Sequence, residues 1–591
     1  MHFRHIVTGG MLVGCALLAS VYTAQTYNPE QHTASLFPAP TQTNAPSKRA
    51  AQRAEPRVVL ASTAAPLQSF ILNATAARSA LRAPALPATA AKTALTSVDS
   101  LRAIQTLQQQ ISSLLQEKAS QKVMEKTDIG LAVYSITRNK ELFALNASNP
   151  LTPASTTKLL PTFSALEQFG TEYLVRTSIC TDATEEITDG VLRGNIYLVG
   201  RGDPLLNIND LENLAVQLKN MGISRITGGV YGDDTFFDRV TNRQEYSGDD
   251  DEVQPTGPIS ALSVQKNLIT VLVSSGYAEK QPVRVQTFPS SDIFTFTVNA
   301  VTQTQKPVKT KRRRWAKPSL SIVESGGHAN GKQHFVINGT LNPNTTVSKL
   351  FFIHHPALAA TDMLRKRIEM FGITIEGKTG LQKTPNTALV LAEFARPLME
   401  IVKLVNKKSD NFSAEHLFKM LGSPLLASDG SQMIFNADAE YRSAQASLRQ
   451  IQTVLKDHAI DNTTWTINDG SGLSRRNKIP PATLIKLLVE ANHAPFSDAF
   501  RSTLAVAGLD GTLEHRMRGT SAEYNVTAKT GTHKNVSALA GYLRTKDGEL
   551  LAFSFIFNGW AVWHYKGLEN RLCQTLAEFS YYMPTDSIAA Q

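Results

Sequence analysis

The sequence has few cysteines and lacks the motifs of several large enzyme classes. Its three cysteines, Cys15, Cys180 and Cys573, form no Cys-x-x-Cys pair and no spacing typical of zinc ligands. His-Glu-x-x-His, the phosphate-binding Gly-x-x-x-x-Gly-Lys-Ser/Thr loop and the Gly-x-Ser-x-Gly elbow are also missing. These absences exclude structural zinc, a disulfide scaffold and an α/β-hydrolase, and no cofactor is predicted. A single bridge between Cys180 and Cys573 stays open if the protein is exported.

The charge balance is mild and indicates no particular partner. Lys and Arg number 60 against 50 Asp and Glu, which gives a net charge of +10. A nucleic-acid binder usually concentrates such charge on one face, whereas only residues 306–317 form a dense basic run here. We therefore predict no nucleic-acid partner. With 42% hydrophobic and 19% charged residues, the composition is globular, and the 591 residues fit about three domains of ~100–200 residues.

The N-terminal residues have the composition of an export signal followed by a linker. A weakly basic start precedes an uncharged apolar run over residues 6–24, so residues 1–24 are predicted to be a signal peptide or a membrane anchor. The segment around Cys15 resembles a lipoprotein box, which leaves lipidation open. Residues 25–96 are rich in Ala, Pro, Thr and Ser without an apolar period, which predicts a flexible linker. Folded structure is expected to start near Ser97.

A serine and a lysine three residues apart are the first candidates for chemistry. Apolar spacing predicts a helix over 101–115, and residues 129–136 and 141–145 are typical of paired strands. Ser155 and Lys158 then lie at the predicted start of another helix, where residues i and i+3 share a face. The Lys158 amine is expected to activate the Ser155 hydroxyl if its pKa is lowered. Taken alone the pattern is common, and a solvated lysine is the simpler interpretation.

Two further polar groups make the pattern specific. Ser-Asp-Asn at 409–411 precedes a predicted helix over 412–420, and Lys-Thr-Gly-Thr at 529–532 precedes a predicted strand over 538–543. With Ser-x-x-Lys, and in this order, they resemble the signature of penicillin-binding proteins and class A β-lactamases. The predicted catalytic residues are Ser155, Lys158, Ser409, Asn411 and Lys529, and the predicted substrate-binding residues are Thr530, Gly531 and Thr532.

Each predicted catalytic group has a physical task. Ser409 can relay a proton between Lys158 and a leaving amine, and the Asn411 amide can hold Lys158 and donate to a substrate carbonyl. Lys529 adds positive charge, which favours the neutral form of Lys158 and attracts an anionic substrate. Asp410 is expected to support its loop rather than to catalyse.

The third group suits substrate binding. Gly531 lets a substrate lie close to the strand, and Thr530 or Thr532 can bind its terminal carboxylate. The backbone N–H groups of Ser155 and Thr532 are the predicted donors to a developing oxyanion. His533 is expected to be a surface side chain beside the cleft, and an effect on substrate preference is the alternative.

Beyond these motifs, residues 128–579 resemble the low-molecular-mass class C penicillin-binding proteins, the D-alanyl-D-alanine carboxypeptidase and DD-endopeptidase family. The similar segments include residues 194–204, 228–233, 260–263, 468–474 and 508–513. The resemblance implies an α+β fold, in which a serine β-lactamase/transpeptidase-like catalytic domain has an antiparallel sheet flanked by helices. The catalytic domain is then discontinuous, with parts at 97–178 and 387–591 around inserted, mainly β or α+β, domains at 179–386.

The resemblance also implies an activity and a location. It implies a serine D-Ala-D-Ala carboxypeptidase and/or DD-endopeptidase that acts on peptidoglycan stem peptides through an acyl-enzyme on Ser155, is inhibited by β-lactams, and resides in the periplasm or exported cell envelope. A β-lactamase-like hydrolase and a non-catalytic peptidoglycan-binding scaffold stay open as alternatives, as does the oligomeric state. The basic run at 306–317 is expected to be a solvated loop, with contact to anionic wall polymer or membrane through Trp315 as the alternative.

Overall fold

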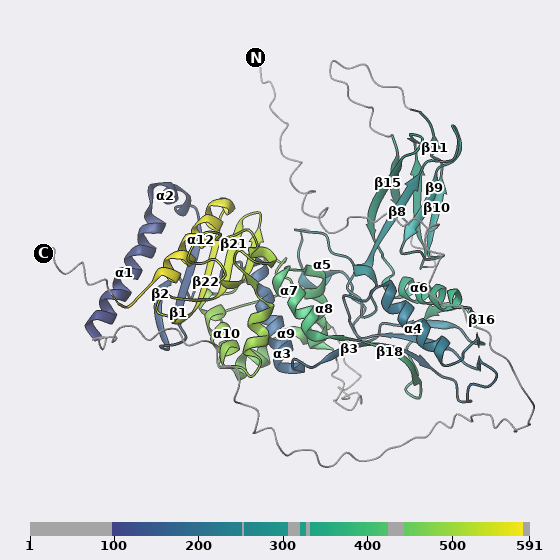
Figure 1. The fold of residues 1–591 in the computed structure, drawn as a ribbon, viewed down its shortest axis with the longest axis horizontal. Coiled ribbons are helices and arrows are strands. Elements are labelled where there is room, and N and C mark those ends of the chain that lie inside the picture. Colours follow the sequence, from purple (N-terminus) through teal and green to yellow (C-terminus); the bar gives the residue numbers. More distant parts are fainter. Residues whose placement is uncertain (1–96, 251–252, 305–318, 327–330, 424–442, 583–591) are drawn as a thin grey trace, which may run out of the picture. The chain divides into compact units, whose positions relative to one another are not determined.

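The computed structural model describes residues 97–250, 253–304, 319–326, 331–423 and 443–582 (Figure 1). The predicted signal or anchor, the linker and the basic run at 306–317 lie outside these residues. Over the described ranges, no helix is both long enough and apolar enough to cross a membrane. The same part of the chain holds no cluster of three or more His, Cys, Asp or Glu side chains that could bind a metal ion.

A six-stranded antiparallel sheet combines strands from both ends of the described chain. Its order is β19-β20-β21-β22-β1-β2, so the predicted strand pair near residues 129–145 extends a sheet whose other strands follow residue 504. Side chains alternate along β21, and Ala538 and Ala540 join one hydrophobic core whereas Leu539 and Leu543 join another. Both faces of the sheet are therefore buried. The strands are β1 (Asp128–Ser135), β2 (Lys140–Leu145), β19 (Ala505–Val506), β20 (Thr527–His533), β21 (Val536–Arg544) and β22 (Leu550–Asn558).

One face of this sheet is covered by helices from the two ends of the described chain. Ile104 and Leu107 of α1 pack in one core with Leu572 and Leu576 of α12 and with Phe553 of the sheet. The helical spacing predicted over 101–115 is confirmed by α1. The bounds are α1 (Ser97–Gln116), α2 (Lys118–Met124) and α12 (Val562–Glu578).

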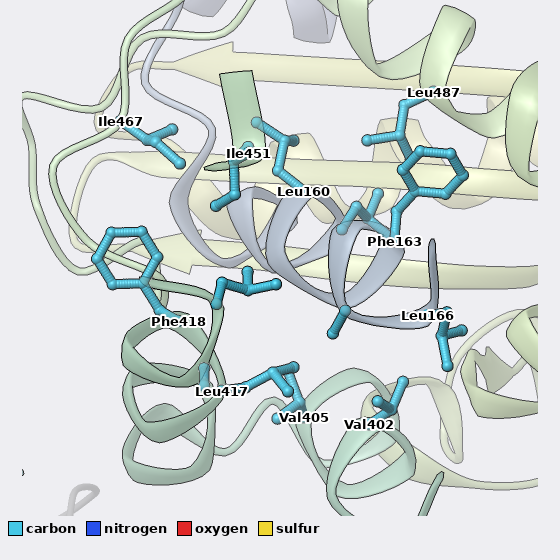
Figure 2. Packing of buried hydrophobic residues seen from close by; sticks show 14 of the residues in the cluster. Leu160, Phe163, Leu166, Val402, Val405, Leu417, Phe418, Ile451, Ile467 and Leu487 are labelled. Carbon is cyan, nitrogen blue, oxygen red and sulfur yellow. The ribbon is translucent and has the colours of Figure 1, made fainter. Parts of the chain in front are cut away.

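The other face is covered by a helical layer built around α3. Leu160 and Phe163 of α3 pack against Val405 of α7, Leu417 of α8 and Leu487 of α10 (Figure 2). Since α3 is enclosed by its neighbours, the 3-10 turn η1 that leads into it is held in place. The bounds are η1 (Ala154–Lys158), α3 (Leu159–Phe169), α7 (Leu398–Lys407), α8 (Asn411–Gly422), α9 (Ser443–Asp457), α10 (Pro481–His493), α11 (Ser497–Thr503) and η4 (Gly511–Leu513).

The region between α3 and α7 has a separate hydrophobic core. A five-stranded sheet of order β17-β7-β5-β3-β18 packs against α4 and α6, with Leu198 and Leu214 among its buried residues. The bounds are β3 (Leu174–Thr181), β4 (Val191–Leu192), β5 (Ile196–Gly200), α4 (Ile208–Asn220), β6 (Arg225–Ile226), β7 (Val230–Asp233), α5 (Arg243–Ser247), α6 (Pro356–Met370), β16 (Thr374–Ile375), β17 (Thr379–Leu381) and β18 (Leu389–Pro397). Because β18 pairs with β3, this sheet joins chain from the two ends of the region; the domain bounds at 178 and 387 stay predictions.

Smaller sheets within this region share its core. Their orders are β15-β8-β9, β10-β13-β12 and β11-β14, and Val271 and Phe335 are buried in the core that also contains Leu198. The bounds are η2 (Gln265–Asn267), β8 (Leu268–Ser274), β9 (Arg284–Phe288), β10 (Phe294–Val298), β11 (Val301–Thr302), β12 (Ser321–Ser325), β13 (Gln333–Asn338), β14 (Thr340–Leu341) and β15 (Thr346–Phe352).

The bridge left open between Cys180 and Cys573 does not form. Both thiols are free and buried. Cys180 packs with Tyr197 in the five-stranded sheet, whereas Cys573 lies on α12 in the core of the six-stranded sheet. The two cysteines thus serve as small apolar residues in two different cores.

Candidate active site

Ser155 and Lys158 lie together on the 3-10 turn η1. The Lys158 Nζ is 2.9 Å from Ser155 Oγ, which is the contact that the i, i+3 spacing predicted. The hydroxyls of Thr156 and Thr157 each donate to a backbone carbonyl three residues earlier, at 2.8 Å, so side chains within the turn fix its shape. Lys158 has no exposed surface, and Ser155 is half-buried.

Three oxygens surround the Lys158 amine. Besides Ser155 Oγ, its Nζ lies 2.7 Å from Asn411 Oδ1 and 2.5 Å from the carbonyl oxygen of Ser471. The amide and carbonyl oxygens can accept hydrogen bonds but cannot donate them. A neutral amine therefore donates its two N–H groups to these oxygens and turns its lone pair to the Ser155 hydroxyl. This geometry suits transfer of the Ser155 proton to Lys158.

The surroundings of Lys158 raise the share of its neutral form above that of an exposed lysine. Burial lowers the pKa of Lys158 to about 8, and the negative charges of Asp469, Glu415 and Asp410 oppose that shift. The hydrogen-bond partners of Nζ described above are neutral oxygens, which stabilise an ammonium ion less than a carboxylate does. With a pKa of about 8, about one amine in ten is neutral at pH 7, so a proton acceptor is available beside Ser155.

The Ser-Asp-Asn group at 409–411 lies at the start of α8. The Asp410 carboxylate caps the helix by accepting from the Ser413 N–H at 2.8 Å, and it pairs with Lys266 Nζ at 2.6 Å. This cap makes Asn411 the first helical residue, with its amide oxygen toward the buried amine. The Asn411 Nδ2 donates to Gln254 Oε1 at 2.9 Å, which fixes the orientation of the amide. Asp410 supports its loop, as predicted.

Lys529 of β20 brings the third motif to the same place. Its side chain has no exposed surface, and Nζ donates to Ser409 Oγ and to the Thr530 carbonyl, both at 2.9 Å. Burial, and to a smaller extent the charge of Lys158, holds the pKa of Lys529 well below its usual range. The positive charge of Lys158 therefore favours the neutral form of Lys529.

The strand that carries Lys529 runs directly beside η1. A Cβ atom on Gly531 would lie 2.5 Å from the Pro153 carbonyl oxygen and 3.2 Å from the Ser155 nitrogen, so the close approach requires glycine. Thr530 is buried and its hydroxyl donates to Thr512 Oγ1 at 2.8 Å, whereas Thr532 is exposed. The structure thus gathers the predicted residues where η1, α8 and β20 meet.

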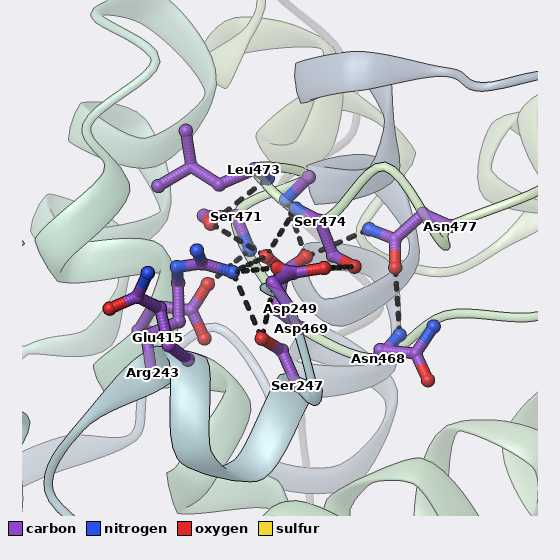
Figure 3. A network of polar contacts seen from close by, with 12 residues as sticks. Arg243, Ser247, Asp249, Glu415, Asn468, Asp469, Ser471, Leu473, Ser474 and Asn477 are labelled. Atoms are coloured by element: carbon purple, nitrogen blue, oxygen red, sulfur yellow. Dashed lines mark hydrogen bonds and ion pairs between the residues drawn. The ribbon is translucent and has the colours of Figure 1, made fainter. Parts of the chain in front are cut away.

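A loop over residues 468–477 supplies a contact that the motifs do not predict. The Ser471 carbonyl binds Lys158, and the loop folds around the buried Asp469 carboxylate, which accepts from the backbone N–H groups of Gly472 at 2.9 Å and Ser474 at 2.8 Å (Figure 3). Gly472 has a φ of +77°, and a Cβ atom there would lie 2.1 Å from the Ala154 carbonyl oxygen. An aspartate among glycines and serines is typical of a tight loop, which was the available sequence signal for this site.

Glu415 of α8 holds the same loop from the other side. Its carboxylate accepts from the backbone N–H groups of Ser471 at 2.7 Å and Gly470 at 3.2 Å, and from the Tyr246 hydroxyl at 2.8 Å. Burial and the neighbouring Asp469 raise the pKa of Glu415 to about 7. The backbone of residue 471 is therefore fixed by a carboxylate at its N–H while its carbonyl contacts the active-site amine.

An arginine from the region between the first two motifs completes this network. Arg243 of α5 is buried, and its guanidinium donates to Asp469 Oδ2 at 3.0 Å and to Asp249 Oδ2 at 2.6 Å (Figure 3). Asp249 also accepts from the Ser474 hydroxyl at 2.7 Å. The inserted region thus helps to hold the loop that contacts Lys158, a role that sequence reasoning missed.

The expectation that His533 is a surface side chain is wrong. Only 6% of the residue is exposed, and its Nε2 lies 2.8 Å from the Gly472 carbonyl oxygen. Burial lowers the pKa of His533, so the neutral ring donates its Nε2–H to that carbonyl. Alternate residues of a strand share a face, which puts His533 on the same side of β20 as Gly531, against η1 and the adjoining loop.

This antiparallel sheet flanked by helices, with a serine, two lysines and an asparagine at one junction, defines a serine hydrolase of the β-lactamase/transpeptidase class. The chain belongs to the D-Ala-D-Ala carboxypeptidase 3 (S13) family, whose model matches residues 107–578. It is 29% identical over 493 residues to a D-alanyl-D-alanine carboxypeptidase of Actinomadura sp. (strain R39), covering 80% of this chain and 85% of that protein. It is 25% identical over 446 residues to the D-alanyl-D-alanine carboxypeptidase DacB of Haemophilus influenzae, covering 75% and 88%.

The fold is similar to that of a solved relative. Penicillin binding protein 4 from Haemophilus influenzae matches with a TM-score of 0.61 and 24% identity, over 78% of this chain and 99% of that chain. The predicted family, the α+β transpeptidase-like fold and the class of serine D-Ala-D-Ala carboxypeptidases are confirmed. The roles of single residues stay predictions.

Proposed function

We propose that this chain hydrolyses D-Ala-D-Ala peptide bonds of peptidoglycan stem peptides through an acyl-enzyme on Ser155. The observation that carries the proposal is the buried Lys158 amine, which lies 2.9 Å from Ser155 Oγ and otherwise contacts two neutral oxygens. In its neutral form this amine can accept the proton of the Ser155 hydroxyl. The names of the relatives from Actinomadura and Haemophilus influenzae support the substrate. A scaffold that only binds peptidoglycan would not need this set of groups.

Acylation starts with proton transfer from Ser155 to Lys158. The Ser155 Oγ attacks the carbonyl carbon of the penultimate D-alanine, and the N–H groups of Ser155 and Thr532 donate to the oxyanion. The proton then passes from Lys158 through Ser409 Oγ to the nitrogen of the terminal D-alanine. The C–N bond breaks, free D-alanine leaves, and an ester on Ser155 remains. Lys529 holds Ser409 in position for this relay.

In deacylation, water replaces the serine hydroxyl as the nucleophile. Water adds to the ester carbonyl and gives its proton to Lys158, and Ser155 leaves as an alcohol with that proton restored. The same steps cut a cross-link when the leaving amine belongs to a second stem peptide, which is DD-endopeptidase activity. A β-lactam acylates the same hydroxyl by opening its ring, because it presents a carbonyl in the place of the D-Ala-D-Ala bond.

Substrate binding uses the strand β20. Its backbone runs beside η1 at Gly531, so a peptide can lie along it with its scissile carbonyl near Ser155. The terminal carboxylate is bound by the hydroxyls of Thr530 or Thr532. The substrate places the protein in the cell envelope, and residues 1–24 are its proposed export signal or anchor.

The test compares wild type, Ser155→Ala and Ser164→Ala with muropeptide monomers and cross-linked dimers, and identifies products by mass. Wild type is expected to release D-alanine from monomers, and Ser155→Ala is expected to release none. Ser164, on the neighbouring helix α3, is the matched control because its buried hydroxyl makes no hydrogen bond and its loss should cost little. Equal cleavage by wild type and Ser155→Ala would refute the assignment of the nucleophile.

Labelled penicillin separates the alternatives. A stable adduct on wild type that is absent from Ser155→Ala is expected for a peptidase. Rapid turnover of penicillin without accumulation of an adduct would instead indicate a β-lactamase. Cleavage of the cross-linked dimers in the muropeptide assay measures the share of endopeptidase activity directly.

A further inference from the structure

Two tryptophans are almost fully exposed at the end of the six-stranded sheet. Trp560, after β22, is 72% exposed, and Trp563, at the start of α12, is 90% exposed. The chain has four tryptophans, and at least two of them are exposed at this end of the sheet. Tryptophan is highly buried on average, and large exposed apolar side chains grouped together mark binding surfaces.

A lysine lies against each of these rings. Lys534 Nζ is 5.5 Å from the ring centre of Trp560, and Lys566 Nζ is 5.9 Å from that of Trp563. The positive charge of each ammonium is attracted to the face of the indole ring. This contact limits the rotation of the tryptophan side chain. These four residues, Trp560, Trp563, Lys534 and Lys566, are here called the tryptophan patch.

The tryptophan patch borders the proposed active site. Lys534 follows directly after β20, three residues from Gly531, which is about 10 Å of extended chain. Asn558, two residues before Trp560, accepts from the Thr152 N–H at 2.9 Å and donates to the Thr152 carbonyl at 2.9 Å. Thr152 in turn lies three residues before Ser155. The segment that presents the patch is therefore hydrogen-bonded to the segment that carries the nucleophile.

We propose that the tryptophan patch binds the glycan strand to which the stem peptide is attached, at the mouth of the active site. One face of a pyranose ring presents C–H groups, which pack on the electron-rich face of an indole. The acidic groups of the polymer complement the two lysines. This inference rests on the proposed function, since a stem peptide that reaches Ser155 carries its glycan strand to the edge of the cleft.

The position of the tryptophan patch beside the proposed active site favours a glycan strand as its ligand. A bilayer bound to the tryptophan patch would press lipid headgroups against the mouth of the active-site cleft. A glycan strand, by contrast, must pass this edge of the sheet whenever its stem peptide is cut. Rigid aromatic side chains with few rotatable bonds bind with a small loss of conformational entropy. The patch thereby raises affinity for the polymer without contributing to the chemistry on the peptide.

The test is cosedimentation of the full chain with purified insoluble peptidoglycan, using Trp560→Ala, Trp563→Ala and the double variant. The double variant is expected to lose at least about tenfold in affinity for the polymer. Tyr277→Ala is the matched control, because Tyr277 is 85% exposed and Arg284 lies 4.4 Å from its ring centre in the inserted region. Restoring aromatic rings with Trp560→Phe and Trp563→Phe is expected to recover most of the affinity.

A second measurement on the same variants separates this inference from the proposed function. Hydrolysis of a soluble D-Ala-D-Ala peptide without sugar is expected to stay within about twofold of wild type in the double variant, whereas hydrolysis of intact peptidoglycan falls. Unchanged sedimentation, or an equal loss for Tyr277→Ala, would overturn the inference. So would loss of binding to anionic phospholipid vesicles with peptidoglycan binding intact, because the patch would then be a membrane contact. Failure of the proposed function would instead show as activity that survives Ser155→Ala.

Discussion

Two lysines with no exposed surface, Lys158 and Lys419, have opposite surroundings. Lys419, on the same helix as Asn411, forms an ion pair with Asp238 at 2.7 Å and donates to the Val240 carbonyl at 2.7 Å. Lys158 contacts neutral oxygens at 2.5 to 2.9 Å. Burial lowers the pKa of both amines, and at Lys419 the charge of Asp238 opposes that shift first. Burial alone therefore does not make an amine a base. A buried amine becomes a base when its hydrogen-bond partners are neutral.

The largest effect is expected at the amine with neutral partners. Lys158→Met should slow acylation of Ser155 by about 10³-fold or more, because the general base is lost. The free energy of unfolding should change by less than about 1 kcal/mol, since the variant removes a buried amine that has no carboxylate partner. Acylation by a fluorescent penicillin and urea unfolding measure the two quantities. A variant that unfolds without losing acylation would break the comparison.

Lys419→Met should give the opposite pair of results. The change takes the Lys419 ammonium away from Asp238, whose side chain is 8% exposed and which still accepts from the Val240 N–H at 3.2 Å. Breaking a buried ion pair by removing one partner costs about 3–5 kcal/mol. We expect the midpoint of urea unfolding to fall sharply. The acylation rate of the folded fraction should stay close to that of wild type at low temperature. If Lys419→Met slowed acylation as much as Lys158→Met, the two amines would not differ in function.

Glu415→Gln tests how the loop at 468–477 controls the base. The negative charge of Glu415 favours the ammonium form of Lys158, so its removal should lower the pKa of Lys158 below about 8 and move the rising limb of the acylation rate to lower pH. One carboxylate oxygen that accepts from Gly470 and Tyr246 becomes a donor, so the plateau rate should fall on the order of tenfold. A pH series of acylation rates separates the two effects.

The control for that series is Glu400→Gln. Glu400 is a carboxylate on α7 whose side chain is 55% exposed and paired with Arg396, so it should leave both the limb and the plateau in place. A plateau that falls in Glu415→Gln without movement of the limb would show that Glu415 acts on the shape of the loop alone. Other titratable groups near Lys158, namely Asp469, Asp410 and Lys529, are unchanged in both variants.

Much of the site was predictable because its chemistry dictates residue types. Ser155, Lys158, Asn411 and Lys529 carry groups that few other side chains can replace, so their order along the chain identified them. The Ser471 contact could not be found in that way, since a backbone carbonyl is present at every residue. The helix over 101–115 and the first strand pair followed from apolar spacing, because each buries one side of a regular element.

The partners that complete the site depend on tertiary packing. Arg243 lies far from Asp469 in sequence, and only the fold of the inserted region brings its guanidinium to that carboxylate. The same holds for Glu415. In the sequence it is one polar residue within a buried helix, and no local pattern connects it to residue 471. His533 was misjudged for a related reason. The expectation rested on the average burial of histidine, whereas the loop that covers this face of β20 comes from another part of the chain.

The smallest predicted effect concerns that histidine. His533→Leu removes the donor to the Gly472 carbonyl, so the free energy of unfolding at pH 7.5 should fall by about 1 kcal/mol. The pKa of His533 in the folded protein lies below its usual value of 6.5, so its contribution is present above pH 6.5 and is lost as the pH falls through the folded pKa. The difference between wild type and variant should therefore shrink from pH 7.5 to pH 5.

The comparison between wild type and His533→Leu isolates the titration of His533. His416 is also buried, and its pKa is lowered to about 4, so wild type loses stability toward acid for a second reason. That loss is common to both proteins and cancels in their difference, which leaves the titration of His533. Urea unfolding at several pH values measures it. Parallel stability curves between pH 5 and pH 7.5 would mean that burial does not hold His533 neutral. An unchanged free energy of unfolding at pH 7.5 would mean that the contact with Gly472 does not help to fix the segment that positions Lys158.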